Sequence, residues 1–143
     1  MYIGEFEYKI DEKGRVPIPP KFRQDLKGES LVLTPGIEQC ITVYPSSQWK
    51  KVAESLTTGP VTQSKLRKLN RAIFSTAYSM KPDPQGRISM PIPLREHAGI
   101  IDDEVIIAGA NNYFEIWNKE AWETEKLNSQ EEAWQIIESL ERH

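Results

Sequence analysis

The residues with the clearest chemical potential in this 143-residue chain are two arginines, each of which ends the same short turn motif. Arg15 ends the segment Asp11-Glu12-Lys13-Gly14-Arg15, and Arg87 ends Asp83-Pro84-Gln85-Gly86-Arg87. Aspartate at the first position and glycine at the fourth favour a type I turn whose glycine has a positive φ. An arginine held by such a turn suits a guanine edge or a phosphate, because its planar guanidinium donates two parallel hydrogen bonds.

A single segment of this kind is most often only a hairpin turn with an exposed arginine. The second copy favours a functional reading, because both arginines occupy equivalent places although the turn interiors differ. A turn needs the aspartate and the glycine but not the arginine that follows. We therefore assign the turn to Asp11, Gly14, Asp83 and Gly86, and we expect DNA contacts from Arg15 and Arg87 at the tips of two hairpins. Further candidate DNA contacts flank them: Lys9, Lys13, Lys81 and Gln85.

The motif belongs to a longer internal repeat. Residues 11–23 align with residues 83–95 at an offset of 72, with identical Asp, Gly, Arg, Pro and Arg. One inserted residue then raises the offset to 73, at which Gly36 matches Gly109 and Trp49 matches Trp122. The repeat predicts two tandem units at 1–60 and 73–127, a basic helical linker at 61–72 and a C-terminal helix at 128–143.

Local patterns predict the elements that position the two arginines. Apolar residues alternate with polar ones on both sides of each turn, as in half-buried strands. Proline pairs then end each strand, with a short helical turn at 22–26 and at 94–98. Further strands are expected at 31–34, 40–44, 104–108 and 113–117, and amphipathic helices from Ser46, in the linker and from Trp122. The capping box at 129–132 predicts the start of a separate final helix. The expected fold class is α+β and rich in β structure.

Composition and residue content limit the function. With 38% hydrophobic and 27% charged residues, the chain resembles a globular protein, and it has neither a membrane-length apolar run nor a basic, apolar leader. A cytoplasmic protein is expected. Cys40 is best read as a small core residue, and the two histidines are His97 and His143. Without a nucleophile and base, a metal cluster or a phosphate loop, we expect no enzyme, no catalytic residue, no metal, no cofactor and no small-molecule substrate.

Charge is unevenly distributed along the chain. The net charge is −3, but residues 119–143 hold seven acidic and three basic residues, so residues 1–118 sum to +1. The linker residues Lys65, Arg67, Lys68 and Arg71 form a basic run without an acid. This run is either a solvated helix face or a set of phosphate contacts.

The sequence resembles a known family. The start Met1-Tyr2-Ile3-Gly4-Glu5-Phe6, residues 11–23, the strand at 40–44 leading into Trp49, and the second Asp83-x-x-x-Arg87 are similar to the MraZ regulators of bacteria. The resemblance extends to about residue 127. It implies two AbrB-like swapped-hairpin units that form a pseudo-dimeric barrel with peripheral helices. Prolines at 17, 84 and 93 and the acidic tail depart from the family pattern.

The resemblance also implies a function. MraZ proteins assemble into rings, commonly octamers, and bind direct repeats in the promoter of their own division and cell-wall operon. The expected partner is thus double-stranded DNA in the nucleoid, the expected activity is transcription regulation as a repressor, and the DNA contacts fall to Arg15 and Arg87. Two alternatives remain open: a ring-forming assembly protein, favoured by the acidic tail, and an antitoxin-type DNA binder. A capped tail helix fits docking onto its own chain or ring better than wrapping a toxin.

Overall fold

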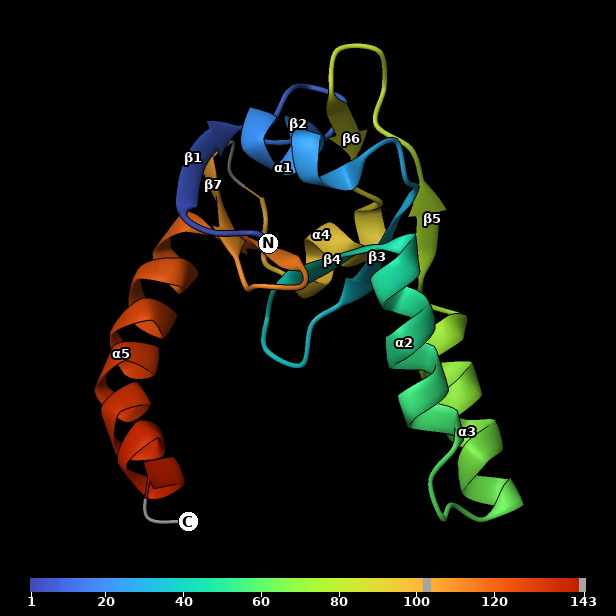
Figure 1. The fold of residues 1–143 in the computed structure, drawn as a ribbon. Helices are drawn as coiled ribbons and strands as arrows, with labels where there is room; N and C mark the ends of the chain where they lie inside the picture. Colours follow the sequence, from blue (N-terminus) through green and yellow to red (C-terminus); the bar gives the residue numbers. More distant parts are fainter. Residues whose placement is uncertain (102–103, 142–143) are drawn as a thin grey trace.

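The computed structural model describes residues 1–101 and 104–141, which form an α+β fold (Figure 1). Six strands make one antiparallel sheet in the order β1-β7-β8-β4-β3-β5, and two short strands make a separate two-stranded ribbon, β2-β6. The strands are β1 (Glu5–Lys9), β2 (Arg15–Pro17), β3 (Leu31–Pro35), β4 (Ile41–Pro45), β5 (Tyr78–Met80), β6 (Arg87–Ser89), β7 (Glu104–Gly109) and β8 (Phe114–Asn118). The predicted fold class and all the predicted strands are confirmed.

The two halves of the chain contribute equivalent strands to the sheet. Exchanging β1 with β5, β3 with β7 and β4 with β8 gives the same strand order, read from the other edge. β1 pairs with β7, β5 pairs with β3, and β2 pairs with β6. The strands that flank each turn therefore pair with strands of the other half of the chain rather than with each other. The interpretation as two AbrB-like units in a barrel, and the boundaries of those units, remain predictions.

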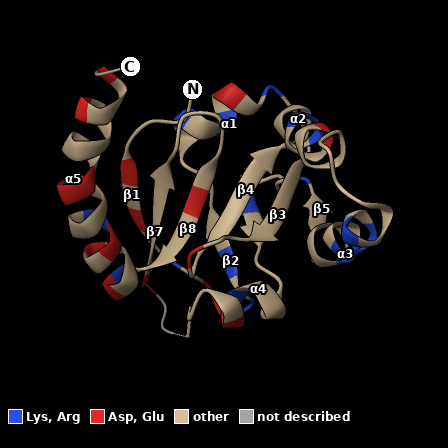
Figure 2. Ribbon diagram, turned by 90° about the horizontal axis from the view of Figure 1, so that it is seen from below, with Lys and Arg blue, Asp and Glu red and all other residues tan. Residues whose placement is uncertain are grey.

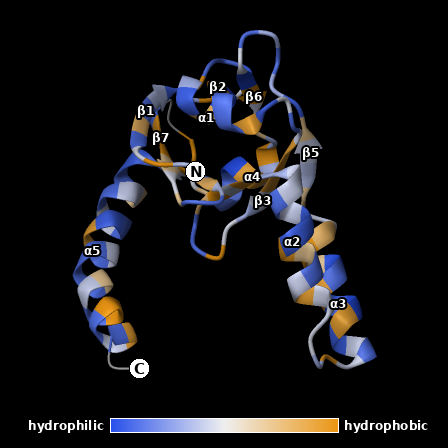
Figure 3. Ribbon diagram, viewed as in Figure 1, coloured by the Kyte–Doolittle hydropathy of each residue, from blue (hydrophilic) through white to orange (hydrophobic). Residues whose placement is uncertain are grey.

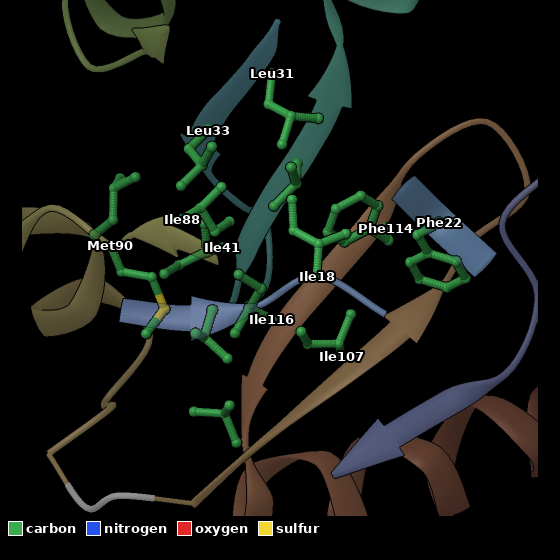
Figure 4. Packing of buried hydrophobic residues seen from close by; sticks show 14 of the residues in the cluster. Ile18, Phe22, Leu31, Leu33, Ile41, Ile88, Met90, Ile107, Phe114 and Ile116 are labelled. Atoms are coloured by element: carbon green, nitrogen blue, oxygen red, sulfur yellow. The ribbon is translucent and has the colours of Figure 1, made fainter. Parts of the chain in front are cut away.

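The hydrophobic core lies between the inner face of the six-stranded sheet and the ribbon (Figure 4). Val16 of β2 and Ile88 of β6 pair across the ribbon and are 0% and 2% exposed. The helix α1 (Pro20–Leu26) adds the buried side chains of Phe22 and Leu26, and α4 (Ile92–His97) adds that of Leu94. Because side chains alternate along a strand, burial of the two central residues turns their neighbours outward. The outward residues of the ribbon are Arg15, Pro17, Arg87 and Ser89.

Two helical arms project from the body on the side away from the ribbon (Figure 1). One arm is the pair α2 (Ser46–Thr57) and α3 (Gln63–Phe74), and the other is α5 (Lys119–Glu141). Thr62 caps α3 by accepting a hydrogen bond from the backbone N–H of Lys65 at 3.3 Å, so the predicted linker helix is confirmed. None of the helices in the described part of the chain is long and apolar enough to span a membrane.

The last arm differs from its prediction. Asn118 starts α5 by accepting hydrogen bonds from the backbone N–H groups of Glu120 and Ala121 at 2.9 and 3.2 Å. The helix then continues to Glu141, and the hydroxyl of Ser129 donates to the Glu125 carboxylate at 3.0 Å inside it. The predicted helix start at Ser129 is wrong. The residues before Ser129 favour helix, and a capping-box sequence starts a helix only where the preceding turn is not itself helical.

Candidate nucleic-acid interface

Both motif turns have the conformation that their aspartate and glycine predict. The Asp11 carbonyl accepts the backbone N–H of Gly14 at 3.0 Å, and the Asp83 carbonyl accepts that of Gly86 at 2.9 Å. Gly14 and Gly86 have φ values of +74° and +77°, which side chains with a Cβ rarely adopt. The two turns therefore have the same backbone conformation although their interior residues differ.

Each motif aspartate binds its own arginine. One carboxylate oxygen of Asp11 accepts the backbone N–H groups of Lys13 and Arg15, both at 2.9 Å, and the other accepts Nε of Arg15 at 2.6 Å. Asp83 repeats the pattern, with Nε of Arg87 at 2.9 Å. These hydrogen bonds lower the pKa of both carboxyls below the usual value, and the largest contribution comes from the backbone N–H of the arginine. Each carboxylate thus orients a guanidinium through a single nitrogen.

The arginines lie at the base of the turns. Arg15 is the first residue of β2 and Arg87 the first of β6, and their side chains are 30% and 27% exposed. The two arginines therefore lie beside the hairpin tips rather than at them, and each is partly covered where its side chain pairs with the motif aspartate. The tips instead carry Glu12-Lys13 and Pro84-Gln85, which are exposed. Nη1 of Arg87 lies 3.8 Å from the Asp11 carboxylate, so the two motifs meet across the ribbon.

A second pair of arginines holds the turns from the side. Arg95 of α4 lies against Gly14, where an added Cβ would be 2.8 Å from its Cζ, and Arg23 of α1 lies equally close against Gly86. Each half of the chain therefore supports the turn of the other half. The sequence marks Arg23 and Arg95 only as nearby basic residues, since this crossed contact depends on the exchange of strands between the halves.

Backbone hydrogen bonds connect the two turns in the same crossed way. Ile18 donates its N–H to the carbonyl of Gly86, and Met90 donates its N–H to the carbonyl of Gly14, each at 2.9 Å. The ribbon and both turns therefore form one hydrogen-bonded unit that presents a pair of related arginines.

The other sequence-derived candidates lie around this unit. Lys13 and Gln85 occupy the exposed tips, and Lys81 lines a shallow hollow beside the second turn. Lys9 is exposed at the end of β1, opposite Glu104 of β7 in the strand register. The structure thus brings Lys13, Gln85 and Lys81 next to the motifs and puts Lys9 at the edge of the main sheet. A DNA contact by any of the four remains a prediction.

The surroundings of the ribbon are basic although the chain is acidic. Residues 9–23 and 81–95 contain eight lysines and arginines against three acidic residues, whereas the whole chain has a net charge of −3. In Figure 2 the red segments of the backbone, which mark Asp and Glu, are most frequent on α5, on the opposite side of the molecule from α3. Such a local excess of positive charge favours contact with a phosphate backbone.

Other chemically versatile side chains are engaged in the fold. Cys40 is buried, and burial raises the pKa of its thiol far above the usual range. Nε2 of His97 lies 3.0 and 3.1 Å from the backbone oxygens of Gly36 and Glu38. Within residues 1–101 and 104–141, no group of three or more His, Cys, Asp or Glu side chains could hold a metal ion.

Comparison with known proteins agrees with the repeated motif. The family model described as "MraZ protein, putative antitoxin-like" matches residues 1–72 and again residues 73–139. A protein of Dehalococcoides mccartyi named transcriptional regulator MraZ is 57% identical over the full length of both chains. Proteins of the same name from Parafrankia and Syntrophomonas wolfei are 43% and 40% identical, covering 94% and 98% of this chain and 92% and 96% of their own. The chain therefore belongs to the MraZ family.

Proposed function

We propose that this chain is a sequence-specific DNA-binding transcriptional regulator that reads DNA with the outer face of the β2–β6 ribbon. The observation that carries the proposal is the pair of arginines, Arg15 and Arg87, that one hydrogen-bonded unit presents on that face. The names of the relatives, all transcriptional regulators, support the same activity.

The geometry suits the major groove of DNA. A two-stranded ribbon is narrow enough to enter that groove, where arginine is the commonest side chain to bind guanine. In each motif the aspartate uses Nε, and a guanidinium has four further N–H donors on its two Nη atoms. Those atoms supply the two parallel hydrogen bonds that a guanine edge or a phosphate accepts. Lys13 and Gln85 at the tips, with Lys9 and Lys81 beside them, add contacts to the backbone or to base edges.

The target in this proposal is the promoter of the protein's own division and cell-wall operon. Direct repeats there would engage several subunits of one ring, an octamer by the family resemblance, and the complex would act as a repressor in the nucleoid. Linked contacts can raise overall affinity by roughly 10²–10⁴ over a single contact. Moderate affinity at each ribbon is then enough for tight binding of the repeated site.

A mobility-shift assay tests the function directly. The purified full chain is titrated onto the DNA immediately upstream of its own coding sequence, with a shuffled duplex of the same composition as the control. We expect the upstream DNA to bind at a protein concentration at least tenfold lower than the shuffled DNA. Equal affinity for both duplexes would reject sequence-specific regulation and favour a protein-interaction role.

A further inference from the structure

The outer face of the ribbon carries two cross-strand pairs of side chains. Arg15 of β2 lies opposite Ser89 of β6, and Pro17 of β2 lies opposite Arg87 of β6. The crossed backbone hydrogen bonds to the two turn glycines flank these pairs, which therefore occupy non-hydrogen-bonded positions of the ladder. In such pairs the Cα atoms are about 4.5 Å apart and the side chains are close neighbours. Each motif arginine thus has one specific neighbour on the outer face.

The two ends of the ribbon differ in that neighbour. Pro17 and Ser89 each follow a motif arginine by two residues, so they are equivalent positions of the internal repeat. Ser89 is exposed, and its hydroxyl can both donate and accept a hydrogen bond. Pro17 is half-buried and presents an apolar ring, and at a non-hydrogen-bonded position its missing N–H costs the ribbon no ladder bond. One end therefore combines a guanidinium with a hydroxyl, and the other combines a guanidinium with an apolar surface.

Two further features distinguish the same ends. Nη1 of Arg87 lies 3.8 Å from the Asp11 carboxylate, whereas the ion pairs of Arg15 within the described residues are limited to Asp11 of its own motif. The exposed tip beside Arg15 carries Lys13, and the tip beside Arg87 carries the neutral Gln85 at the equivalent position. Both turns are coloured as hydrophilic in Figure 3, so both ends suit a polar ligand. The ribbon has related halves but presents different chemistry at each end.

We infer that Ser89 and Pro17 determine which bases the ribbon recognises beside the guanines of its two arginines. A two-fold symmetric protein matches a palindromic site, so a difference between the halves of the ribbon makes the matching site asymmetric. Ser89 adds a hydrogen bond to a base edge next to the guanine of Arg15. Pro17 contacts a thymine next to the guanine of Arg87, because the thymine methyl is the apolar group that the major groove presents. The inference rests on the proposed function and names the specificity-determining residues of the same face.

Symmetrised duplexes test the difference between the two ends. A single element of the upstream DNA is used, and replacement of one base pair at a time locates its two essential guanines and the centre between them. Two further duplexes carry either the left or the right half twice, as inverted repeats. We expect the wild-type chain to bind the native element about three- to tenfold more tightly than either symmetrised duplex. Each of these duplexes lacks one hydrogen bond or one buried methyl group, which contributes about that much.

Two variants assign the contacts to residues. Pro17→Ser puts a hydroxyl beside both arginines, so it should bind one symmetrised duplex more tightly than the native element. Ser89→Ala removes only a hydroxyl, and it should lose the preference for the base pair that flanks the guanine in that same half-site. The matched control Ser79→Ala removes an exposed hydroxyl from β5 of the main sheet and should keep the wild-type base preferences. Far-UV circular dichroism checks the fold of each variant.

A change in the DNA tests Pro17 without a change in the protein. Deoxyuridine in place of one thymine removes only the methyl group. We expect one such replacement, in the half-site that Ser89→Ala leaves unchanged, to weaken wild-type binding about fourfold, the contribution of one buried methyl group. The same replacement should not weaken binding by Pro17→Ser.

Several results would overturn the inference. It is wrong if the wild-type chain binds the native and both symmetrised duplexes equally, if no single deoxyuridine weakens binding, or if Ser89→Ala or a folded Pro17→Ser keeps the wild-type base preferences. Any of these results, together with a preference of the wild type for the native element over shuffled DNA, rejects the inference and leaves the proposed function standing. Equal binding of native and shuffled DNA by the wild type rejects both.

Discussion

At the level of single residues, the aspartate of each motif has two roles, and the sequence alone does not show that one side chain performs both. Its backbone and one carboxylate oxygen close the turn, while the other oxygen binds the Nε of the arginine four residues later. Because the aspartate and the arginine are only four residues apart, their ion pair closes a short loop and reduces the number of rotamers open to the arginine. The motif therefore prepares a guanidinium for a ligand rather than merely exposing it.

The turn glycines give a prediction with an internal control. Gly14→Ala should destabilise the fold by more than Gly28→Ala, although both glycines have positive φ values, +74° and +81°. The left-handed backbone alone costs about 1–2 kcal/mol for a residue with a Cβ. At Gly14 the new Cβ also displaces the Arg95 guanidinium, whereas nothing lies within 4 Å of Gly28. Urea unfolding of the two variants measures the difference, and equal losses would mean that Arg95 does not support the turn.

Glu115 is a residue that the sequence did not single out. It alternates with apolar residues on β8 and so resembles an ordinary surface residue, but it is partly buried beside Cys40 and accepts the indole N–H of Trp117 at 3.1 Å. Burial raises the pKa of this carboxyl above its usual value. Its charged form therefore opposes folding above that pKa.

Glu115→Gln should raise the melting temperature at pH 7, because the amide keeps an acceptor for Trp117 and removes a partly buried charge. A carboxyl with a raised pKa in the folded state favours folding at low pH, and this contribution disappears as pH rises through the folded-state pKa. The advantage of the variant should consequently shrink as pH falls toward 4. Thermal unfolding of both proteins from pH 4 to pH 8 checks the trend, and a constant difference would contradict it.

At the level of elements, alternation correctly predicted the strands but not their partners. The alternation of apolar and polar residues around Val16 and around Ile88 shows which side chains face inward. This alternation is the same whichever strand lies alongside, so it does not identify the partner strand. The pairing of β2 with β6 and of β1 with β7 is a long-range property that local patterns do not carry. The crossed support of the turns by Arg23 and Arg95 depends on that pairing, so it was not predictable from the motif.

The anchoring of α5 by its first two turns gives a prediction for the element. Trp122 packs on Trp117 with ring centroids 5.8 Å apart and donates to the Glu5 carboxylate at 2.6 Å, whereas Trp134 is 73% exposed. Trp122→Ala should lower the free energy of unfolding by roughly 1–3 kcal/mol, and Trp134→Ala by less than about 0.5 kcal/mol. Urea unfolding is measured at a concentration at which scattering shows single subunits. Equal effects would mean that both parts of α5 pack on the body.

At the level of the whole molecule, the two halves are folded into each other. The sequence repeat predicted two units in tandem, and the family model also matches the chain twice. In space, however, every strand of residues 1–60 pairs with a strand of the other half: β1 with β7, β2 with β6, β3 with β5 and β4 with β8. Only the pairing of β3 with β4 stays within that half. One core of side chains from both halves fills the interior.

Residues 1–72 alone should therefore not fold as a monomer. The fragment would lose the partners of β1 and β2 and one of the two partners of β3 and of β4, and it would expose core residues such as Val16 and Ile41. We expect its circular dichroism to lack the native sheet signal at low micromolar concentration, and we expect addition of residues 73–143 to restore it in a 1:1 complex. A monomeric, cooperatively folded fragment would show instead that each half is an independent domain.

The account as a whole depends on recognition of DNA by the two motif arginines. The most direct measurement is the affinity of the Arg15→Ala/Arg87→Ala variant for the upstream and the shuffled duplex at one salt concentration, with Arg15→Lys/Arg87→Lys as a charge-conserving control. Each bidentate arginine–base pair contributes about 1–3 kcal/mol of discrimination. We predict that the alanine variant binds both duplexes equally while keeping the wild-type mass, and that the lysine variant keeps binding but loses most of its preference, because an ammonium lacks the planar fork. Unchanged preference for the upstream duplex in the alanine variant would contradict the account and reduce the motif to a structural turn.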